Sequence, residues 1–186
     1  PGVGRQIDFN KKYIVVLQHP VTNEINDSLD QISTTLDALL KINIQTILLW
    51  PNIDAGSNET SKGIRTFREN NPDNKIYFST GIEPSDFLKV IYNSSCLVGN
   101  SSVGIRESAF LGVPVVNIGS RQKNRERGKN VIDVNHNSLE ILNAVKLQIE
   151  HGIYDSSKIF GNGNSGTKIA DILSKVKLKY HKTITF

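Results

Sequence analysis

Short runs of aliphatic and β-branched residues recur along this chain, and polar turns and helix-like segments separate them. A continuous apolar run of this length is typical of a β-strand that is buried on both faces. Strands that alternate with helices predict an α/β, Rossmann-like fold, in which helices cover both faces of a parallel sheet. The predicted strands are residues 13–17, 47–50, 75–78, 96–98, 115–118 and 131–134.

Helical spacing of the apolar residues marks the segments between these runs. Asn26 or Asp27 is a suitable cap for the first helix, whose apolar residues lie between Leu29 and Leu40. A polar helix around Ile64 and Phe67 follows the second strand. The other predicted helices cover residues 84–91, 105–111, 139–149 and 169–176.

The length of 186 residues is enough for one sizeable core. We therefore expect a single domain over residues 1–186, with a linker, or the end of a crossing segment, at 1–12 and a terminal helix and tail at 167–186. Because the chain begins with Pro1 and contains no methionine, we also expect it to be a piece of a longer or processed protein.

Polar side chains follow successive predicted strands at the points where the strands end. In an open parallel sheet the carboxyl ends of the strands meet at one edge, and ligands bind there. We therefore expect these groups to form one site. They are His19, Asn52, residues 79–83, the loop at 99–104 and residues 119–122.

The loop after the fourth predicted strand runs through two glycines and two serines into a helix. Ser101 or Ser102 is placed to cap this helix, and the remaining free N–H groups suit a phosphate. Gly99 and Gly104 let backbone and ligand come close. Glu107 lies about one turn into the helix, where a carboxylate accepts both hydroxyls of a ribose. The alternative is an ordinary capped helix with a surface glutamate.

His19 and Arg121 are further candidates for this site. His19 is placed to donate to a phosphate or sugar oxygen, or to act as an acid or base near neutral pH. Its alternative role is to stack on Pro20. The guanidinium of Arg121, which follows a strand end and a glycine, pairs with phosphate or fixes its own loop.

Asn52 and Ile82 are candidates for contact with a nucleoside. The Asn52 side chain suits a hydrogen bond to a base or ribose, and its alternative is a local turn with Asp54. Ile82 offers backbone groups to the edge of a base, which is a role that any residue type can fill.

The charge pattern excludes several classes of function. A net charge of +4 favours anionic ligands, but the basic residues are scattered, which argues against nucleic acid as a partner. The lone Cys96, which we expect to be buried, allows no disulfide within the chain and indicates a reducing, cytoplasmic location. Membrane-length apolar stretches, metal-ligand spacings and a Walker loop are absent, so we expect no membrane association, metal or cofactor.

Five longer motifs resemble the hydrolysing UDP-N-acetylglucosamine 2-epimerases, and in particular the sialic-acid branch of that family. The likeness runs from about residue 13 to about residue 173 and is specific, because the motifs are long. They are residues 18–22 (QHPVT), 51–57 (PNIDAGS), 99–107 (GNSSVGIRE), 112–126 (GVPVVNIGSRQKNRE) and 161–164 (GNGN).

The resemblance implies a parent protein with two Rossmann-like domains in the glycosyltransferase-B arrangement. This chain then corresponds to the C-terminal, nucleotide-binding domain. The family eliminates UDP to form a 2-acetamidoglucal and then adds water, which yields N-acetylmannosamine. Most of its acid and base carboxylates lie on the N-terminal domain, so we expect the fragment to be inactive. We also expect the parent protein to be a homo-oligomer.

The same resemblance implies roles for individual residues. His19, the candidate catalytic residue, lies beside the phosphates. The residues that the resemblance assigns to the diphosphate are Ser101, Ser102 and Gly104. It assigns Glu107 to the ribose and places Asn52, Ile82 and Arg121 near UDP.

Two other functions fit the same residues. One is the donor-nucleotide domain of a glycosyltransferase with this fold, which an acceptor-linked product would distinguish from an epimerase. The other is a nucleotide-binding module without catalytic activity, against which a competent two-domain parent protein would argue.

Overall fold

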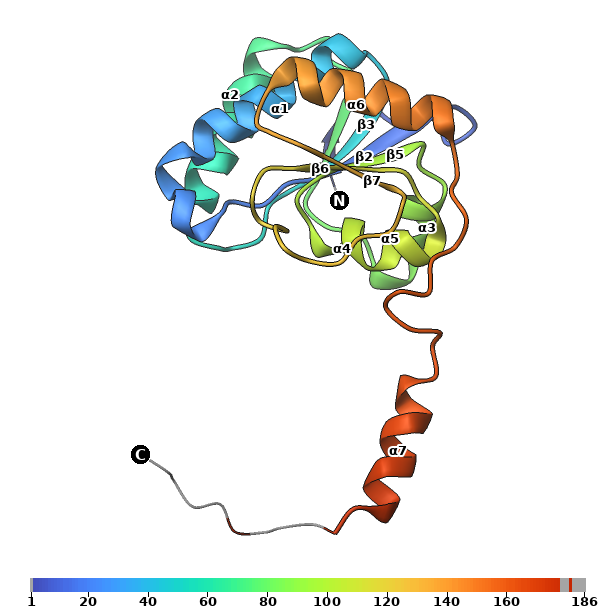
Figure 1. Ribbon diagram of the computed structural model, residues 1–186. Coiled ribbons are helices and arrows are strands. Elements are labelled where there is room, and N and C mark those ends of the chain that lie inside the picture. Colours follow the sequence, from blue (N-terminus) through green and yellow to red (C-terminus); the bar gives the residue numbers. More distant parts are fainter. Residues whose placement is uncertain (1, 178–180, 182–186) are drawn as a thin grey trace.

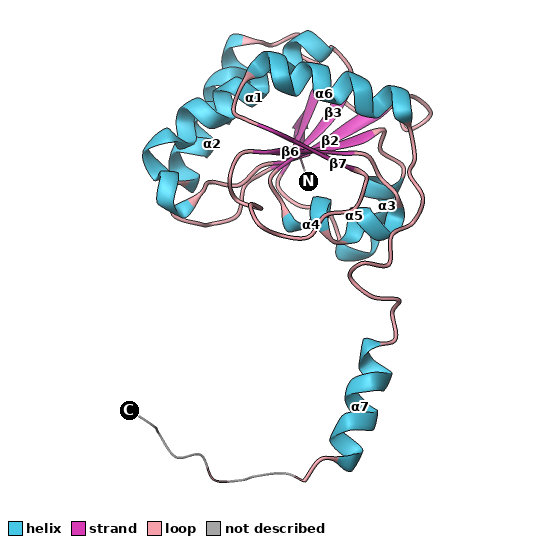
Figure 2. Ribbon diagram, viewed as in Figure 1, coloured by secondary structure: helices cyan, strands magenta, loops and turns pink. Residues whose placement is uncertain are grey.

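The computed structural model describes residues 2–177 and 181, and these residues form a seven-stranded sheet flanked by helices (Figure 1, Figure 2). The strand order is β1-β4-β3-β2-β5-β6-β7, and all neighbours are parallel except β1 and β4. The predicted Rossmann-like fold is thus confirmed. The strands are β1 Gly2–Gly4, β2 Tyr13–Leu17, β3 Gln45–Leu49, β4 Ile76–Ser79, β5 Cys96–Gly99, β6 Val115–Ile118 and β7 Val131–Val134.

The helices lie in two layers, one on each face of the sheet (Figure 2). Helices α1, α2 and α6 pack on one face, and α3, α4 and α5 lie on the other. The helical segments are η1 Thr22–Asp27, α1 Ser28–Ile42, α2 Ser57–Asn70, α3 Pro84–Tyr92, α4 Ser102–Ile105, α5 Glu107–Leu111, α6 Ser138–His151 and α7 Ser165–Lys175. None of them has both the length and the apolar character needed to cross a membrane.

Strand β2 shows why the apolar runs are continuous rather than alternating. Ile14 and Val16 point into the core under α1, α2 and α6, whereas Tyr13 and Val15 point into the core on the opposite face. Successive side chains of a strand face opposite sides, so a strand covered on both sides must be apolar at every position. Cys96 on β5 is fully buried, as predicted.

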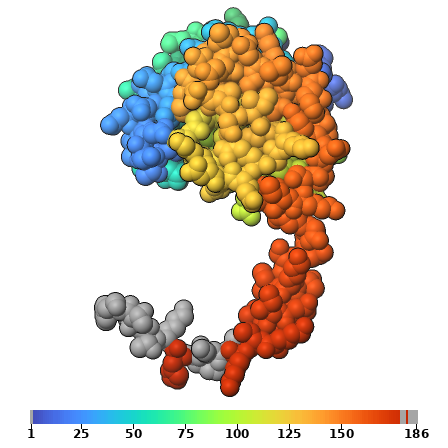
Figure 3. All heavy atoms as spheres, in the orientation of Figure 1, coloured from blue at the N-terminus to red at the C-terminus, as the bar shows by residue number. Residues whose placement is uncertain are grey.

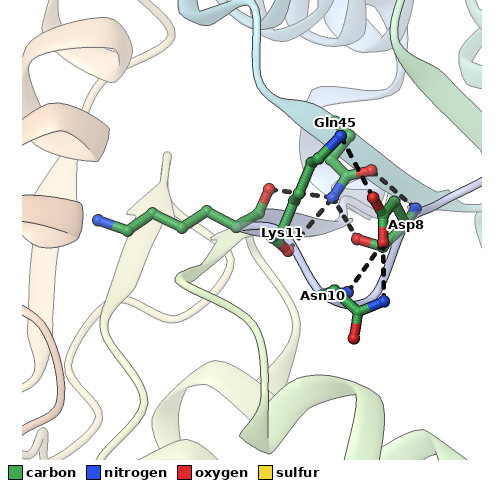
Figure 4. A network of polar contacts seen from close by, with 5 residues as sticks. Asp8, Asn10, Lys11 and Gln45 are labelled. Atoms are coloured by element: carbon green, nitrogen blue, oxygen red, sulfur yellow. Dashed lines mark hydrogen bonds and ion pairs between the residues drawn. The ribbon is translucent and has the colours of Figure 1, made fainter.

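The N-terminal segment corrects the expectation of a linker at residues 1–12. Gly2–Gly4 adds an antiparallel strand to the edge of the sheet by pairing with β4. The segment after it is also fastened, because the Gln45 side chain donates hydrogen bonds to the carbonyl oxygens of Asp8, Lys11 and Lys12 at 2.7–3.2 Å (Figure 4). Backbone pairing and one glutamine therefore hold a polar segment that has no apolar periodicity.

The C-terminal helix α7 stands away from the rest of the molecule (Figure 1, Figure 3). It begins at Ser165, slightly before the predicted start of the terminal segment. Its apolar side chains are exposed, including Leu173 at 58%, as is Val176, which follows the helix, at 48%. The rest of the predicted tail, residues 178–186 apart from His181, lies outside the described residues.

One buried amide ties α6 to β6 and to the residue before β7. The Gln148 side chain donates to the carbonyl oxygens of Val115 and Asn130 at 2.7 and 2.8 Å, and it accepts a hydrogen bond from the Tyr154 hydroxyl. It is fully buried, so no solvent replaces these partners if it is removed.

We expect Gln148→Leu to lower the free energy of unfolding by about 2–4 kcal/mol, because it leaves buried polar groups without partners. Chemical denaturation measures this change. Asn143→Leu, the same kind of change at an exposed position of α6, should alter stability by less than about 0.5 kcal/mol. Equal effects of the two substitutions would contradict this account of Gln148.

Candidate functional site

The carboxyl ends of β2 and β5 lie next to each other at the centre of the sheet, because Leu17 pairs with Gly99. The chain leaves β2 toward α1 on one face and leaves β5 toward α4 on the other. A crevice forms at such a change of direction, and this is where open α/β sheets bind ligands. The residues directly after these two strands are therefore the starting point of the site.

A buried asparagine holds His19 in place. The Asn100 side chain accepts a hydrogen bond from the backbone N–H of His19 at 2.7 Å and donates one to its carbonyl oxygen at 2.8 Å. Asn100 has no exposed surface and His19 is 5% exposed. The backbone of His19 is therefore fixed on both sides by a single amide.

The ring of His19 has a defined environment. Its Nδ1 atom accepts a hydrogen bond from the backbone N–H of Asn52 at 3.2 Å. Burial, together with the nearby positive charge of Arg121, lowers the pKa of His19 to about 4, although the Asp54 carboxylate opposes this shift. The free protein therefore holds a neutral imidazole here at pH 7.

The loop after β6 reaches the same place. Arg121 donates to the carbonyl oxygen of Asn100 at 3.3 Å, and its guanidinium lies 3.8 Å from the carboxylate of Asp54. Gln122 donates to the same carbonyl oxygen at 2.8 Å. Ser120 donates to Glu24, which follows β2 in the sequence, so the loop is held from two directions.

The serine loop has the predicted cap but not the predicted continuous helix. Ser101 is the N-cap of α4, and its hydroxyl accepts a hydrogen bond from the N–H of Val103 at 3.4 Å. The helix is interrupted at Arg106, whose φ of −97° and ψ of −69° separate α4 from α5. Ser102 is thus the first residue of a short helix, and Glu107 begins a separate one.

The two glycines of this loop serve different purposes. Gly99 has a φ of +134°, and a Cβ atom there would lie 2.2 Å from the carbonyl oxygen of Leu17. At Gly104 a Cβ atom would lie 2.9 Å from the Val115 side chain. The lack of a side chain at Gly104 therefore lets α4 pack closely on β6, and its predicted role beside a ligand stays a prediction.

Two predicted site residues, Glu107 and Ile82, line two cavities that do not include His19. Glu107 is exposed and lines a cavity of about 340 Å³ with Leu88, Phe110 and Gly161. Ile82 lines a different cavity of about 440 Å³ between the N-terminal segment and β4. The structure thus brings His19, Arg121 and the backbone of Asn52 together around Asn100, and it places Glu107 and Ile82 further out. The Asn52 side chain is exposed and makes none of these contacts.

Sequence reasoning missed the structural roles of Asn100, Gln122 and Asp54. The sequence indicated the role of Asn100 only through its position, because it is a polar residue between a buried strand and the helix cap Ser101. Gln122 gave a weaker signal, as an amide within a motif at a strand end. We expected Asp54 only as a turn residue, whereas it lies beside Arg121. Within residues 2–177 and 181, no cluster of three or more His, Cys, Asp or Glu side chains is suited to a metal ion.

Comparison with known proteins gives a consistent result. Residues 3–174 match the family described as UDP-N-acetylglucosamine 2-epimerase. The chain is 32% identical over 171 residues to a UDP-N,N'-diacetylbacillosamine 2-epimerase (hydrolyzing) of Legionella pneumophila, covering 92% of this chain and 45% of that protein. It is 29% identical over 158 residues to a UDP-N-acetylglucosamine 2-epimerase of Neisseria meningitidis, covering 84% and 41%. The chain thus spans less than half the length of these relatives.

Solved structures share the fold. The UDP-N-acetylglucosamine 2-epimerase of Neisseria meningitidis, bound to UDP-N-acetylglucosamine, superposes with a TM-score of 0.70 at 16% identity, covering 91% of this chain and 46% of that one. The enzyme of Methanocaldococcus jannaschii gives a TM-score of 0.68 at 19% identity, covering 91% and 46%.

The buried neutral His19 predicts a pH dependence of stability. An unfolded chain protonates this histidine below about pH 6.5, whereas the folded chain does so only near pH 4. The unfolded state therefore binds more protons between these values, and the folded state loses on the order of 3 kcal/mol as the pH falls through this window.

Urea denaturation at pH 7 and pH 4.5 measures this loss. We expect His19→Gln to lose clearly less stability between the two pH values than the unchanged chain, because glutamine does not titrate. His151→Gln, at an exposed position, is the matched control. The same loss in the unchanged chain and in His19→Gln would contradict the assignment.

Proposed function

Since this chain belongs to the UDP-N-acetylglucosamine 2-epimerase family, we propose that it is the UDP-binding half of a hydrolysing member of that family. The observation that carries this proposal is the convergence of His19, Arg121 and the serine loop around Asn100, at the central crevice of a Rossmann-like sheet. This edge combines a positive charge, hydrogen-bond donors and a helix start, which together suit a diphosphate.

In the proposed complex the diphosphate lies against Ser101, Ser102 and Gly104. Ser101 caps the short helix α4 and Ser102 is its first residue, and the start of a helical turn is where an anion is stabilised. Arg121 supplies a full positive charge on the opposite side. The diphosphate therefore lies between the loops that follow β5 and β6.

The uridine extends outward from the diphosphate in this proposal. Glu107 accepts the ribose hydroxyls, and Asn52 and Ile82 contact the nucleoside. Because Glu107 and Ile82 line separate cavities, the proposal requires that the start of α5 and the loop before α3 move together when UDP binds. Ligand-induced loop closure of this kind is common at nucleotide sites.

The proposed reaction converts UDP-N-acetylglucosamine and water into N-acetylmannosamine and UDP. Elimination across C1 and C2 needs a base at the C2 proton while the departing diphosphate is stabilised. Groups on this chain serve the diphosphate side. The carboxylates nearest to it are already engaged, because Asp54 pairs with Arg121 and Glu24 binds Ser120 and Gln31.

We therefore assign the acid and base residues to a preceding half of the protein, which the relatives' greater length accommodates. The sugar is an N-acetylated amino sugar, either UDP-N-acetylglucosamine or a diacetamido sugar such as the one named for the Legionella relative. The apolar side of α7, which includes Ile169, Ile172 and Leu173, packs in this proposal against the other half of the protein. The parent protein is in our proposal a homo-oligomer.

UDP binding tests the ribose assignment. We expect Glu107→Ala to weaken UDP by about 5- to 150-fold in calorimetry, since charge-assisted hydrogen bonds contribute about 1–3 kcal/mol. UMP should be weakened as well, because it shares the ribose. Glu150→Ala on the exposed side of α6 is the control, and unchanged UDP affinity in Glu107→Ala would refute the role of Glu107.

The chain by itself should bind UDP weakly and should not epimerise UDP-N-acetylglucosamine, because the C2 base is missing. Incubation with this substrate, followed by measurement of UDP and N-acetylmannosamine, tests this expectation. Turnover of about 1 per second or faster would show that all catalytic groups lie on this chain. Transfer of the sugar to an added acceptor would instead identify a glycosyltransferase.

A further inference from the structure

We propose that His19 acts as a neutral hydrogen-bond donor through Nε2, that the backbone N–H of Asn52 holds the ring in this tautomer, and that Asn100 is the positioning residue for it. This inference deepens the proposed function, on which it rests for the identity of the ligand. It assigns to His19 one of the two roles that its sequence position left open, which were hydrogen bonding and acid–base catalysis.

The contact with Asn52 determines which nitrogen carries the proton. A backbone N–H is only a donor, so the Nδ1 atom of His19, 3.2 Å away, must present a lone pair to it. In a neutral ring the proton then lies on Nε2, the nitrogen that remains available to a ligand. Protonation of the ring would place an N–H on Nδ1, facing the N–H of Asn52. Two donors cannot form a hydrogen bond with each other, so this contact disfavours the imidazolium form.

The charges around the ring act in the same direction. Arg121, from the loop after β6, repels a cation at His19, and burial of the ring penalises it further. Asp54, from the loop after β3, favours a cation, but its carboxylate faces the guanidinium of Arg121 at 3.8 Å. These effects leave the pKa of His19 well below neutral pH.

Asn100 fixes the position from which the Nε2 proton is offered. Its backbone N–H donates to the carbonyl oxygen of Leu17, which is the last residue of β2. Its side chain binds the backbone of His19, so the contact between the two segments extends beyond the ends of β2 and β5. The backbone carbonyl oxygen of Asn100 accepts hydrogen bonds from the side chains of Gln122 and Arg121. A displacement of this amide would therefore move His19 and the Arg121 loop together.

A neutral donor is sufficient for the departure of a diphosphate. When the bond between C1 and the diphosphate oxygen breaks, its electron pair stays on that oxygen, and the C2 proton passes to a base on the other half of the protein. UDP leaves as an anion and needs no proton from His19. A hydrogen bond from Nε2 stabilises the developing charge, as the neutral histidine of triosephosphate isomerase stabilises an oxyanion.

The protonation state is measurable directly in this chain. Two-bond 1H–15N correlation spectra of 15N-labelled protein at pH 7 distinguish the two neutral tautomers and the imidazolium, and loss of a signal in His19→Gln identifies the residue. We expect the Nε2–H tautomer both without and with saturating UDP. An imidazolium in the UDP complex, or the Nδ1–H tautomer in either state, would overturn the proposal.

The role of Asn100 is tested by Asn100→Asp, which keeps the shape but removes the donor to the carbonyl oxygen of His19. We expect a mixture of His19 tautomers and UDP affinity lower by about tenfold. Asn117→Asp is the matched control, because Asn117 is also a buried amide but binds Asp133 instead. If both variants leave the tautomer unchanged, or both change it equally, Asn100 is not the positioning residue.

Folding defects do not obscure this result. If Asn100→Asp does not fold, Gln122→Leu removes one contact to the carbonyl oxygen of Asn100 and leaves both hydrogen bonds to His19 intact. It should weaken UDP while keeping the His19 tautomer, and a changed tautomer would contradict the proposal. Absence of UDP-induced shifts at Ser101 to Gly104 would refute the nucleotide site, whereas the tautomer of the free chain would still test the inference about His19.

Discussion

The pairing of β2 with β5 is the interaction on which the rest of the structure depends. It joins strands that are far apart in the sequence and places β3 and β4 on one side and β6 and β7 on the other. The two loops that leave this pair diverge to opposite faces, and the crevice between them is the candidate site. The pairing is tight at its end, since any side chain at Gly99 would collide with the carbonyl oxygen of Leu17.

Apolar patterning was sufficient to predict most of the fold, because a buried parallel strand must be apolar on both faces. It predicted β6 and β7 with their observed bounds. It could not predict β1, because Gly2–Gly4 has no pattern of its own and becomes a strand only through the unpaired edge of β4. The break at Arg106 was equally invisible, since helical spacing continues through it.

The candidate site was predictable as a set of strand ends but not as a network. The positions of His19, Ser101 and Arg121 follow from where strands stop, which apolar runs reveal. The contact of Asn100 with His19 spans 81 positions of the chain, and it arises only when β2 and β5 pair in one register. Tautomers, and cavities such as those beside Glu107 and Ile82, likewise depend on contacts between distant segments, which a local pattern does not specify.

The spacing between Arg121 and Asp54 bears on how Arg121 serves the proposed diphosphate. The guanidinium is partly solvated, with 30% of its side chain exposed, and its partner Asp54 is 42% exposed at 3.8 Å. An exposed, loosely spaced ion pair contributes little free energy, typically about 0–1 kcal/mol. Arg121 therefore keeps most of its capacity to bind an anion, which is why we propose it as a partner of the diphosphate, while the buried contacts of Asn100 keep His19 and the loop after β6 in place.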